Sequence, residues 1–584
     1  MTRDASAAGA AGTAPALPAP PPAPRDPDSL VHAAEGRLTL GLSPTAMGLA
    51  CLDWYAHLAN APFRRLALLD AARRQAGRWA QACAGRQVIE AAPHDHRFDD
   101  PAWRQPPFDA LYQGFLLLEE WWGQATAPVA GVDPHNARIV AFAARQWLDM
   151  LSPSNFAWLN PQVIAATMQQ SGGNFVEGAR LFLGDLQQAL NGGPPADAPL
   201  QVGRDLAITP GKVVLRNELI ELIQYAPSTG AVRPEPVLVV PAWIMKYYIL
   251  DLSPHDSLIR YLVGRGYTVF AISWRNPDAA LRDTAFDDYR TLGPMAALDA
   301  IQAITGAAKV HGCGYCLGGT LLSVAAAAMA RDGDPRLTSL SLFAAQTDFT
   351  EAGELQLFVS ADQLAFLDDV MASQGYLDSR QMAGTFQMLR SNDLVWSRLI
   401  DNYLLGRPEA TGDLMAWNAD GTRMPARMHA EYLRWMYLEN RLAEGRFMVG
   451  GHPVSVADIA APLFVVGTES DHVAPWRSVY KIHLLNAGEI SFVLTSGGHN
   501  AGIVSEPGHP HRHFRLAERA AGGHYLGPDE WMARTPAQDG SWWLLWADWL
   551  DRRSGAAVAP PPLGNAKQGY PALMDAPGSY VLEH

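Results

Sequence analysis

The chain has 584 residues, of which 48% are hydrophobic and 18% are charged. This composition is typical of a globular protein, and the length exceeds what one compact core holds, so two or more domains are expected. With 59 acidic against 45 basic residues the net charge is -14, which argues against nucleic acid or an anionic membrane surface as the main partner.

The sequence gives no sign of a membrane span or of a disulfide framework. The longest apolar runs, such as 321–330, are about half of the ~20 residues that a membrane-spanning helix needs. The first residues lack the charged-then-apolar pattern of a signal peptide, and four cysteines are few for so long a chain. We therefore expect no transmembrane segment and a reducing, cytoplasmic setting in which cysteine stays a free thiol.

The first 200 residues contain two kinds of sequence. Residues 1–27 are rich in Ala and Pro and are predicted to be a disordered tail, because such a tract cannot bury enough apolar surface to fold. Residues 28–200 are predicted to form a helical N-terminal domain. Large apolar residues recur there at three-to-four spacing in the stretches 49–83, 111–122 and 138–151.

From residue 201 to residue 584 the pattern indicates an α/β catalytic domain. Short β-branched runs alternate with helical stretches, which indicates βαβ units and a parallel sheet covered by helices on both faces. Residues 346–440 interrupt this alternation with apolar, mostly helical sequence and are predicted to form an inserted cap. The predicted strands are 237–243, 267–274, 309–316, 337–343, 462–468 and 491–497.

The segment 309–328 carries the clearest chemical signal. A strand leads into Gly314-Tyr315-Cys316-Leu317-Gly318 and then into a helix of small residues. This is the nucleophile elbow of the α/β-hydrolase fold, with Cys316 in the position that Ser usually occupies. The helix N-terminus favours the thiolate, and the backbone N–H of Leu317 is expected to point to a developing oxyanion.

Cys313 and Cys316 also form a C-x-x-C pair, which leaves other readings open. Such a pair can carry redox chemistry or supply half of a metal site, and the turn can also be a plain Gly-rich turn. Cys51 and Cys83 lie far away in the helical region, so no second C-x-x-C completes a zinc site. We therefore expect Cys316 to be the nucleophile and Cys313 to be a small buried core residue.

Two later strands supply an acid and a base in the order that this fold uses, nucleophile then acid then histidine. Asp471 follows the strand at 462–468, and His499 follows the strand at 491–497. Both lie at the edge of the sheet where an open α/β fold places its chemistry. His499 is expected to take the Cys316 proton, while Asp471 either orients the imidazole or acts on a hydroxyl itself.

Other histidines are rivals for the role of base. His472 adjoins Asp471, and His509, His511 and His513 alternate in one short loop. Such a run can bind metal, but no carboxylate or Cys cluster accompanies it, so we interpret it as a polar loop and predict no metal site.

A series of motifs in order resembles the polyhydroxyalkanoate synthases, that is, the poly(3-hydroxyalkanoate) polymerases, and is most similar to the single-subunit class I type. The resemblance covers about residues 90 to 552. The motifs are DHRFDDPAW (95–103), LSPSNFAWLNP (151–161), KYYILDLSP (246–254), ISWRNPD (272–278), GYCLGGT (314–320), NDLVW (392–396), DHVAPW (471–476) and SGGHNAGIV (496–504).

The resemblance implies a function for the residues found above. Cys316 would carry the acyl group, His499 would be the general base and Asp471 the third catalytic residue. The enzyme would polymerise (R)-3-hydroxyacyl-CoA and release CoA, with no cofactor, since coenzyme A is part of the substrate and a product. The resemblance also implies a homodimer on polyester granules in the cytoplasm. The alternative on the same fold is an esterase, a thioesterase or a depolymerase.

The sequence departs from the family pattern at two places near the expected site. After the strand at 237–241 it has Ala242, Trp243 and Met245, where many class I members have Pro, Cys and Asn. This loop is expected to give the second oxyanion donor, the backbone N–H of Ile244. Asn500 follows His499 at a position where an apolar residue is common.

The sequence also allows predictions for one carboxylate, one group of tryptophans and one apolar segment. Asp251 is a carboxylate near the expected site, and we interpret it as structural. Trp542, Trp546 and Trp549 recur at three-to-four spacing, which favours a helix docked on the core over an exposed binding face. The apolar segment 355–371 is either a cover that keeps water from the acyl-enzyme or simply packed core.

Overall fold

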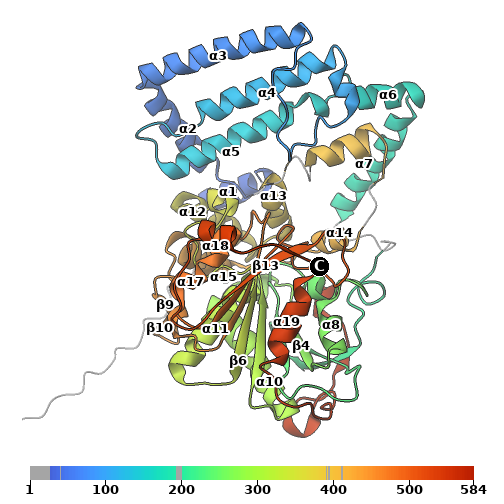
Figure 1. Cartoon of the computed structure of the whole chain (residues 1–584), viewed down its shortest axis with the longest axis vertical. Helices are drawn as coiled ribbons and strands as arrows, with labels where there is room; N and C mark the ends of the chain where they lie inside the picture. Colours follow the sequence, from blue (N-terminus) through green and yellow to red (C-terminus); the bar gives the residue numbers. More distant parts are fainter. Residues whose placement is uncertain (1–26, 40, 192–199, 390, 392–394, 409–411) are drawn as a thin grey trace, which may run out of the picture.

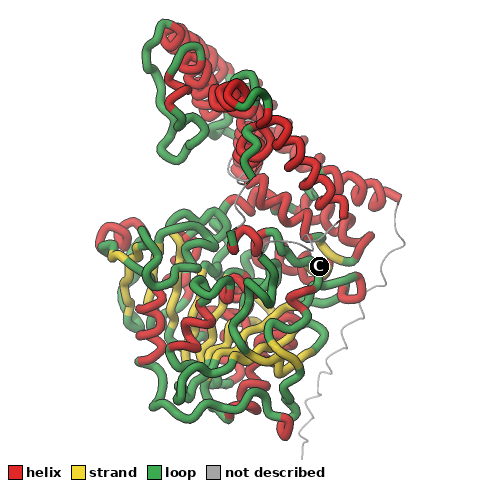
Figure 2. Tube along the Cα trace, turned by 90° about the vertical axis from the view of Figure 1, so that its right-hand side faces the viewer, coloured by secondary structure: helices red, strands yellow, loops and turns green. Residues whose placement is uncertain are grey.

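The computed structural model describes residues 27–39, 41–191, 200–389, 391, 395–408 and 412–584. The predicted tail at 1–27 lies outside these residues except for Pro27, which begins the first helix. Figure 1 shows an α/β part built around a central sheet and a layer of N-terminal helices that projects away from it. Figure 2 shows the same layer leaning outward from the sheet in a view turned by a quarter.

Proline and short polar residues set the starts of the N-terminal helices. Proline stands at the first turn of α2, α3, α5 and α6, where its missing N–H costs nothing. Ser43, Asp133 and Asn160 accept backbone N–H groups at three of these starts. The helices are α1 (Pro27–Leu38), α2 (Pro44–Ala59), α3 (Pro62–Cys83), α4 (Phe108–Ala125), α5 (Pro134–Leu151), α6 (Pro161–Gln169) and α7 (Gly173–Asn191).

The stretch 49–83, predicted to be helical, is two helices rather than one. The break falls at Asn60 and Ala61, directly before Pro62. Proline has no N–H to continue a helix and its ring clashes with the preceding turn, so the chain turns here and starts again. The predicted helices at 111–122 and 138–151 are present as α4 and α5.

The main sheet is mixed, with a parallel centre formed by the six predicted strands. Its order is β14-β13-β12-β11-β6-β5-β3-β4-β2-β1-β15. The central strands are fully or mostly buried, as expected for a sheet with both faces covered. They are β3 (Val237–Val240), β4 (Val269–Trp274), β5 (Val310–Tyr315), β6 (Leu337–Phe343), β11 (Leu463–Thr468) and β12 (Ile490–Thr495).

The strands outside this centre are antiparallel, so the expectation of a purely parallel sheet holds only for the middle. β2 pairs antiparallel with β4, and β13 pairs antiparallel with β12. The outer strands each carry at least one charged residue. They are β1 (Gly211–Arg216), β2 (Ile220–Tyr225), β13 (His513–Arg519), β14 (Gln538–Asp539) and β15 (Met574–Asp575).

Helices cover both faces of the sheet. Leu340 and Ser341 are neighbours on β6 and therefore point to opposite faces. Leu340 lies on the side of α11, near Leu322, while Ser341 accepts a hydrogen bond from the indole of Trp546 on α19. Helices outside the cap are α8 (Leu258–Gly264), α9 (Phe286–Arg290), α10 (Ala296–Thr305), α11 (Leu317–Asp332), α16 (Trp476–Tyr480), α17 (Ile482–Leu485), α18 (Pro528–Arg534) and α19 (Trp542–Asp551).

The chain between β6 and β11 forms the mostly helical insertion. The N-terminal helices rest on it: α1 packs against α12, and α7 packs against η8 (Leu399–Leu404). Its other elements are α12 (Ala361–Gln374), β7 (Tyr376–Leu377), α13 (Ser379–Leu389), α14 (Asp413–Asn418), β8 (Met424–Pro425), α15 (Ala426–Tyr432), the π-helix η9 (Leu433–Leu438), β9 (Phe447–Val449) and β10 (His452–Val454).

Within the segment 355–371, the part that belongs to α12 packs as core, whereas none of the residues up to Phe358 is buried. Leu364, Phe366 and Val370 of α12 are buried, and α12 contacts α1 and α15. The tryptophans of α19 are buried as well, which confirms the expectation of a docked helix. In the described part of the chain, every helix is too short or too polar to cross a membrane.

Candidate active site

Cys316 lies on a strained turn between β5 and α11. Its backbone has φ +52° and ψ −126°, a conformation that costs energy in any residue with a Cβ. The turn leaves no room for neighbouring side chains: a Cβ on Gly314 would lie 2.4 Å from the Cα of Gly319, and one on Gly318 would lie 2.1 Å from the Val240 carbonyl oxygen. The glycines that the motif analysis required are therefore needed for steric reasons.

Asp471 and His499 are held in a direct hydrogen bond at the carboxyl ends of β11 and β12. His499 Nδ1 lies 2.7 Å from Asp471 Oδ2, and the Thr468 hydroxyl donates to the same oxygen at 3.0 Å. The other oxygen, Oδ1, accepts the backbone N–H groups of Val473 and Ala474, each at 2.8 Å. The side chain of Asp471 is fully buried, so these four bonds fix the carboxylate completely.

The charges of the pair stabilise each other. Burial alone would raise the pKa of Asp471, but His499 and the two backbone N–H groups hold it below its ordinary value. Burial alone would lower the pKa of His499, but the Asp471 carboxylate and Cys316 raise it well above its ordinary value. His499 and the Cys316 side chain therefore interact electrostatically. The fold thus brings the three predicted residues into one chain of contacts.

The rival residues lie elsewhere. Cys313 is wholly buried in β5, and burial raises the pKa of its thiol well above the ordinary value. His513 Nε2 pairs with Glu469 at 3.1 Å, and His509 Nδ1 lies 2.9 Å from the Pro510 carbonyl. Within the described residues, no group of three or more His, Cys, Asp or Glu side chains is arranged to hold a metal ion.

The loop after β3 is braced by the base of the insertion. Thr422 donates its hydroxyl to the Trp243 carbonyl at 2.5 Å and its N–H to the Ile244 carbonyl at 3.1 Å. The Trp417 indole donates to the Lys246 carbonyl at 2.8 Å. In a trans peptide the N–H points opposite to the carbonyl before it, so the N–H of Ile244 points away from Thr422.

That geometry leaves two backbone donors for a negatively charged oxygen. Leu317 is the first residue of α11, and its N–H has no acceptor within the helix. A Cβ on Gly318 would also lie 2.5 Å from the Pro241 carbonyl oxygen, so the start of α11 and the loop carrying Ile244 are in close contact. The predicted donors Leu317 and Ile244 therefore come from two segments that pack together.

Tyrosines from the insertion enclose the thiol. Tyr432 and Tyr437 are buried, their hydroxyls are 3.4 Å apart, and both interact electrostatically with Cys316. Cys316 itself is only 9% exposed. The insertion thus covers the predicted nucleophile through α15 and η9.

Asp251 has the contacts of a structural residue. It is buried, its Oδ1 accepts the hydroxyls of Thr209 and of Ser257, and Ser257 in turn caps the N-terminus of α8. Burial raises the pKa of Asp251. The carboxyl group therefore ties the start of α8 to the loop before β1.

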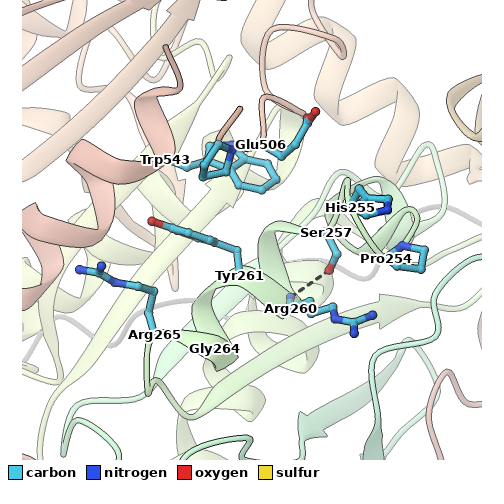
Figure 3. Close-up of a pocket in the computed structure, with 10 residues that line it drawn as sticks. Pro254, His255, Ser257, Arg260, Tyr261, Gly264, Arg265, Glu506 and Trp543 are labelled. Carbon is cyan, nitrogen blue, oxygen red and sulfur yellow. Dashed lines mark hydrogen bonds between the residues drawn. The ribbon is translucent and has the colours of Figure 1, made fainter. Parts of the chain in front are cut away.

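A separate cavity of about 390 Å³ lies between α8 and α19. Figure 3 shows Tyr261 of α8 next to Trp543 of α19, with ring centroids 5.6 Å apart, and the Arg260 backbone N–H bonded to Ser257 at the N-terminus of α8. Cys316, Asp471 and His499 do not line this cavity. It is distinct from the candidate active site.

Two residues next to the predicted machinery were not singled out for a role by sequence reasoning. Tyr315 precedes Cys316 and donates its hydroxyl to the Asn500 side-chain oxygen at 2.6 Å. Its ring also lies against the His499 imidazole, with centroids 5.6 Å apart. The signal available was adjacency: each residue borders a motif residue, and Asn500 departs from the family pattern.

The fold and the site define the class of protein. Residues 235–506 match the family model described as alpha/beta hydrolase fold. Similar solved structures include a putative hydrolase from Agrobacterium vitis S4, which covers 50% of this chain and 91% of its own at 14% identity and a TM-score of 0.30. A thermophilic esterase from Thermogutta terrifontis covers 59% and 98% at 14% identity and a TM-score of 0.28. The chain has an α/β-hydrolase core with a helical N-terminal region.

Sequence relatives narrow the class to one family. Residues 94–262 match the model "Poly-beta-hydroxybutyrate polymerase (PhaC) N-terminus", and residues 22–64 match "Poly-beta-hydroxybutyrate polymerase N terminal". The poly(3-hydroxyalkanoate) polymerase of Methylorubrum extorquens is 39% identical over 86% of this chain and 83% of its own. The PhaC subunit of the Cupriavidus necator polymerase is 35% identical over 86% and 85%. The chain belongs to the poly(3-hydroxyalkanoate) polymerase family and is an enzyme of the acyltransferase type.

Proposed function

We propose that this enzyme polymerises (R)-3-hydroxyacyl groups from coenzyme A thioesters, with Cys316 as the acyl carrier. The observation that carries the proposal is the contact chain Asp471–His499–Cys316 at the end of a strained elbow. The family membership supports the substrate class, because its members are named for polymers of 3-hydroxyalkanoates. No cofactor is needed, since coenzyme A is part of the substrate and a product.

In the first half-reaction Cys316 takes the acyl group. Its sulfur attacks the thioester carbonyl, a new sulfur–carbon bond forms, and the bond to the CoA sulfur breaks. The proton of Cys316 passes to His499 and from there to the departing CoA thiolate. The N–H groups of Leu317 and Ile244 stabilise the negative oxygen of the tetrahedral intermediate. One thioester replaces another, so the acyl group stays activated.

In the second half-reaction a 3-hydroxyl attacks the acyl-Cys316 thioester. His499 accepts the hydroxyl proton and returns it to the departing Cys316 sulfur, and an oxoester is formed. Four hydrogen bonds hold the Asp471 carboxylate, and His499 is the only charged partner in them. This arrangement supports a role for Asp471 in orienting the imidazole. The direct activation of the hydroxyl by Asp471 would require one of these bonds to break.

The proposed site has a single reactive thiol, and this constrains how the polymer grows. Cys313 is buried in the sheet and its thiol pKa is raised by that burial, so it does not serve as a second carrier. Cys316 holds one acyl group at a time. The growing chain therefore passes from Cys316 to the hydroxyl of an incoming hydroxyacyl-CoA, and the lengthened acyl group then returns to Cys316 with loss of CoA.

Tyr432, Tyr437 and the rest of the insertion exclude water from the acyl-enzyme, which would otherwise be hydrolysed. The family resemblance also supports a homodimer at the surface of a polyester granule in the cytoplasm. Exposed apolar side chains on α2 and α3, among them Leu52, Phe63 and Leu66, support contact with such a surface.

The test is a direct assay of the purified protein with (R)-3-hydroxybutyryl-CoA, following free CoA and the size of the product. Release of CoA together with an insoluble polyester supports the proposal. Release of CoA with monomeric 3-hydroxybutyrate would show a thioesterase instead. Without CoA release, neither activity would stand.

A further inference from the structure

The residues that border the predicted nucleophile and the predicted base are bonded to each other. Tyr315 is the last residue of β5 and directly precedes Cys316, while Asn500 directly follows His499. The Tyr315 hydroxyl donates to Asn500 Oδ1 at 2.6 Å. Tyr315 is 2% exposed, so its side of this bond is shielded from water.

The same tyrosine also touches the base itself. Its ring lies 5.6 Å from the His499 imidazole at an angle of 36°. Burial, with further contributions from Cys316 and Asp471, raises the pKa of the Tyr315 hydroxyl well above its ordinary value. The hydroxyl therefore stays protonated and remains a donor, which fixes the oxygen of the Asn500 amide toward it and the NH₂ group away from it.

The NH₂ group of Asn500 faces the insertion. It donates to Asn418 Oδ1 on α14, at the longer distance of 3.4 Å. Asn418 is exposed, so this second bond competes with water more than the bond to the buried Tyr315 does. The strong link in the chain is the one between the nucleophile turn and the histidine loop.

We propose that Tyr315 and Asn500 are a positioning pair that sets the placement of His499 relative to Cys316. The inference rests on the proposed function, because it assigns the pair to the cysteine–histidine chemistry. It does not make either residue catalytic: neither is assigned contact with substrate.

The experiment is a double-mutant cycle with Tyr315→Phe and Asn500→Leu, which remove the polar atoms and keep the shapes similar. Asn500→Leu leaves the buried Tyr315 hydroxyl without its acceptor, and Tyr315→Phe leaves the half-buried Asn500 amide oxygen without its donor. We expect kcat to fall about tenfold in each single variant with KM unchanged. The double variant removes both groups, and its kcat is expected to be no lower than that of either single variant. A fall of about a hundredfold in the double variant, or singles equal to the unmodified enzyme, would overturn the proposal.

A second readout separates positioning from general stability. Alkylation of Cys316 by iodoacetamide, followed by mass spectrometry of its peptide well below the melting temperature, reports the thiol's reactivity beside His499. We expect the rate to fall in each single variant and to recover in the double variant. Loss of thermal stability with an unchanged alkylation rate would make the pair merely structural and would contradict the proposal.

Two controls complete the design. Asn418→Ala removes only the exposed end of the chain and should change kcat less than about twofold; an effect as large as that of Tyr315→Phe would place the positioning contact in the insertion instead. Cys316→Ala is assayed in parallel. If it still releases CoA, the proposed function fails, whereas an inactive Cys316→Ala beside normal Tyr315→Phe and Asn500→Leu variants overturns this inference alone.

Discussion

Oδ2 of Asp471 is hydrogen-bonded to Nδ1 of His499 at 2.7 Å, and Oδ1 accepts two backbone N–H groups from the same turn. The carboxylate is thus oriented by the backbone, and the imidazole is oriented by the carboxylate. Since Nδ1 is engaged by Asp471, Nε2 is the nitrogen left for Cys316, with which His499 interacts electrostatically.

Asp471→Asn should lower kcat on the order of a thousandfold, because an amide cannot hold the same tautomer or stabilise the imidazolium. The matched control is Asp251→Asn. Only Oδ1 of Asp251 accepts hydrogen bonds, while Oδ2 has no partner, so an amide can take its place with kcat nearly unchanged. Steady-state release of CoA measures kcat for both variants. An equal fall in kcat for Asp471→Asn and Asp251→Asn would show that Asp471 is not a catalytic residue.

Stability should depend on pH through His499. Its pKa in the folded protein lies well above the ordinary value of 6.5, so the folded state binds the proton more tightly. The stabilisation is therefore fully present below about pH 6.5 and is lost as the pH rises through the raised pKa. Asp471, with its lowered pKa, contributes in the opposite sense and loses its contribution as the pH falls below about 3.8.

Denaturant unfolding of the unmodified protein and of His499→Gln, compared from pH 6 to pH 9, measures this linkage. We expect the difference in free energy of unfolding to be largest near pH 6 and to shrink as the pH rises. The exposed His511 gives the control, since His511→Gln should leave the pH dependence in place. A difference that grows with pH would contradict the assigned charges.

The brace between Thr422 and the Trp243 carbonyl predicts a second effect on the rate. Thr422→Val keeps the shape but leaves a buried carbonyl without its donor, at a cost of about 1–3 kcal/mol. We expect kcat to fall about tenfold with KM unchanged, because the Ile244 N–H is no longer held for the transition state. Thr422→Ser keeps the hydroxyl and should retain most of kcat; equal loss in both variants would argue against the brace.

The docked helix α19 predicts a large effect on stability. Trp546 is fully buried and its indole donates to the Ser341 hydroxyl at 2.8 Å. Trp546→Ala should lower the free energy of unfolding by about 3–5 kcal/mol. Leu544 on the same helix is 48% exposed, and Leu544→Ala should change it by less than about 0.5 kcal/mol. Chemical denaturation compares the two, and similar losses would show that α19 is not packed as described.

The sequence predicts the centre of this fold well because its signals are local. A buried parallel strand is a short apolar run, and the elbow needs its glycines within a few residues of Cys316, so both are visible in one window. The order of Cys316, Asp471 and His499 is equally visible, since each follows a predicted strand.

The remaining features depend on pairing over long distances. β1 pairs with β15, so Lys212 lies opposite Asp575, more than 360 residues away. Nothing in the local pattern of either strand specifies that partner. The same holds for Thr422, which acts through a backbone carbonyl on a distant loop. Every residue has a backbone carbonyl, so the sequence of the loop does not show which carbonyl will accept a hydrogen bond from Thr422.

The most direct test of the central claim is mass spectrometry of the protein after brief exposure to (R)-3-hydroxybutyryl-CoA. The account predicts a 3-hydroxybutyryl adduct on Cys316 that is absent from Cys316→Ala and retained in Cys313→Ala. An adduct on Cys313, or continued release of CoA by Cys316→Ala, would contradict the assignment of Cys316 as the acyl carrier.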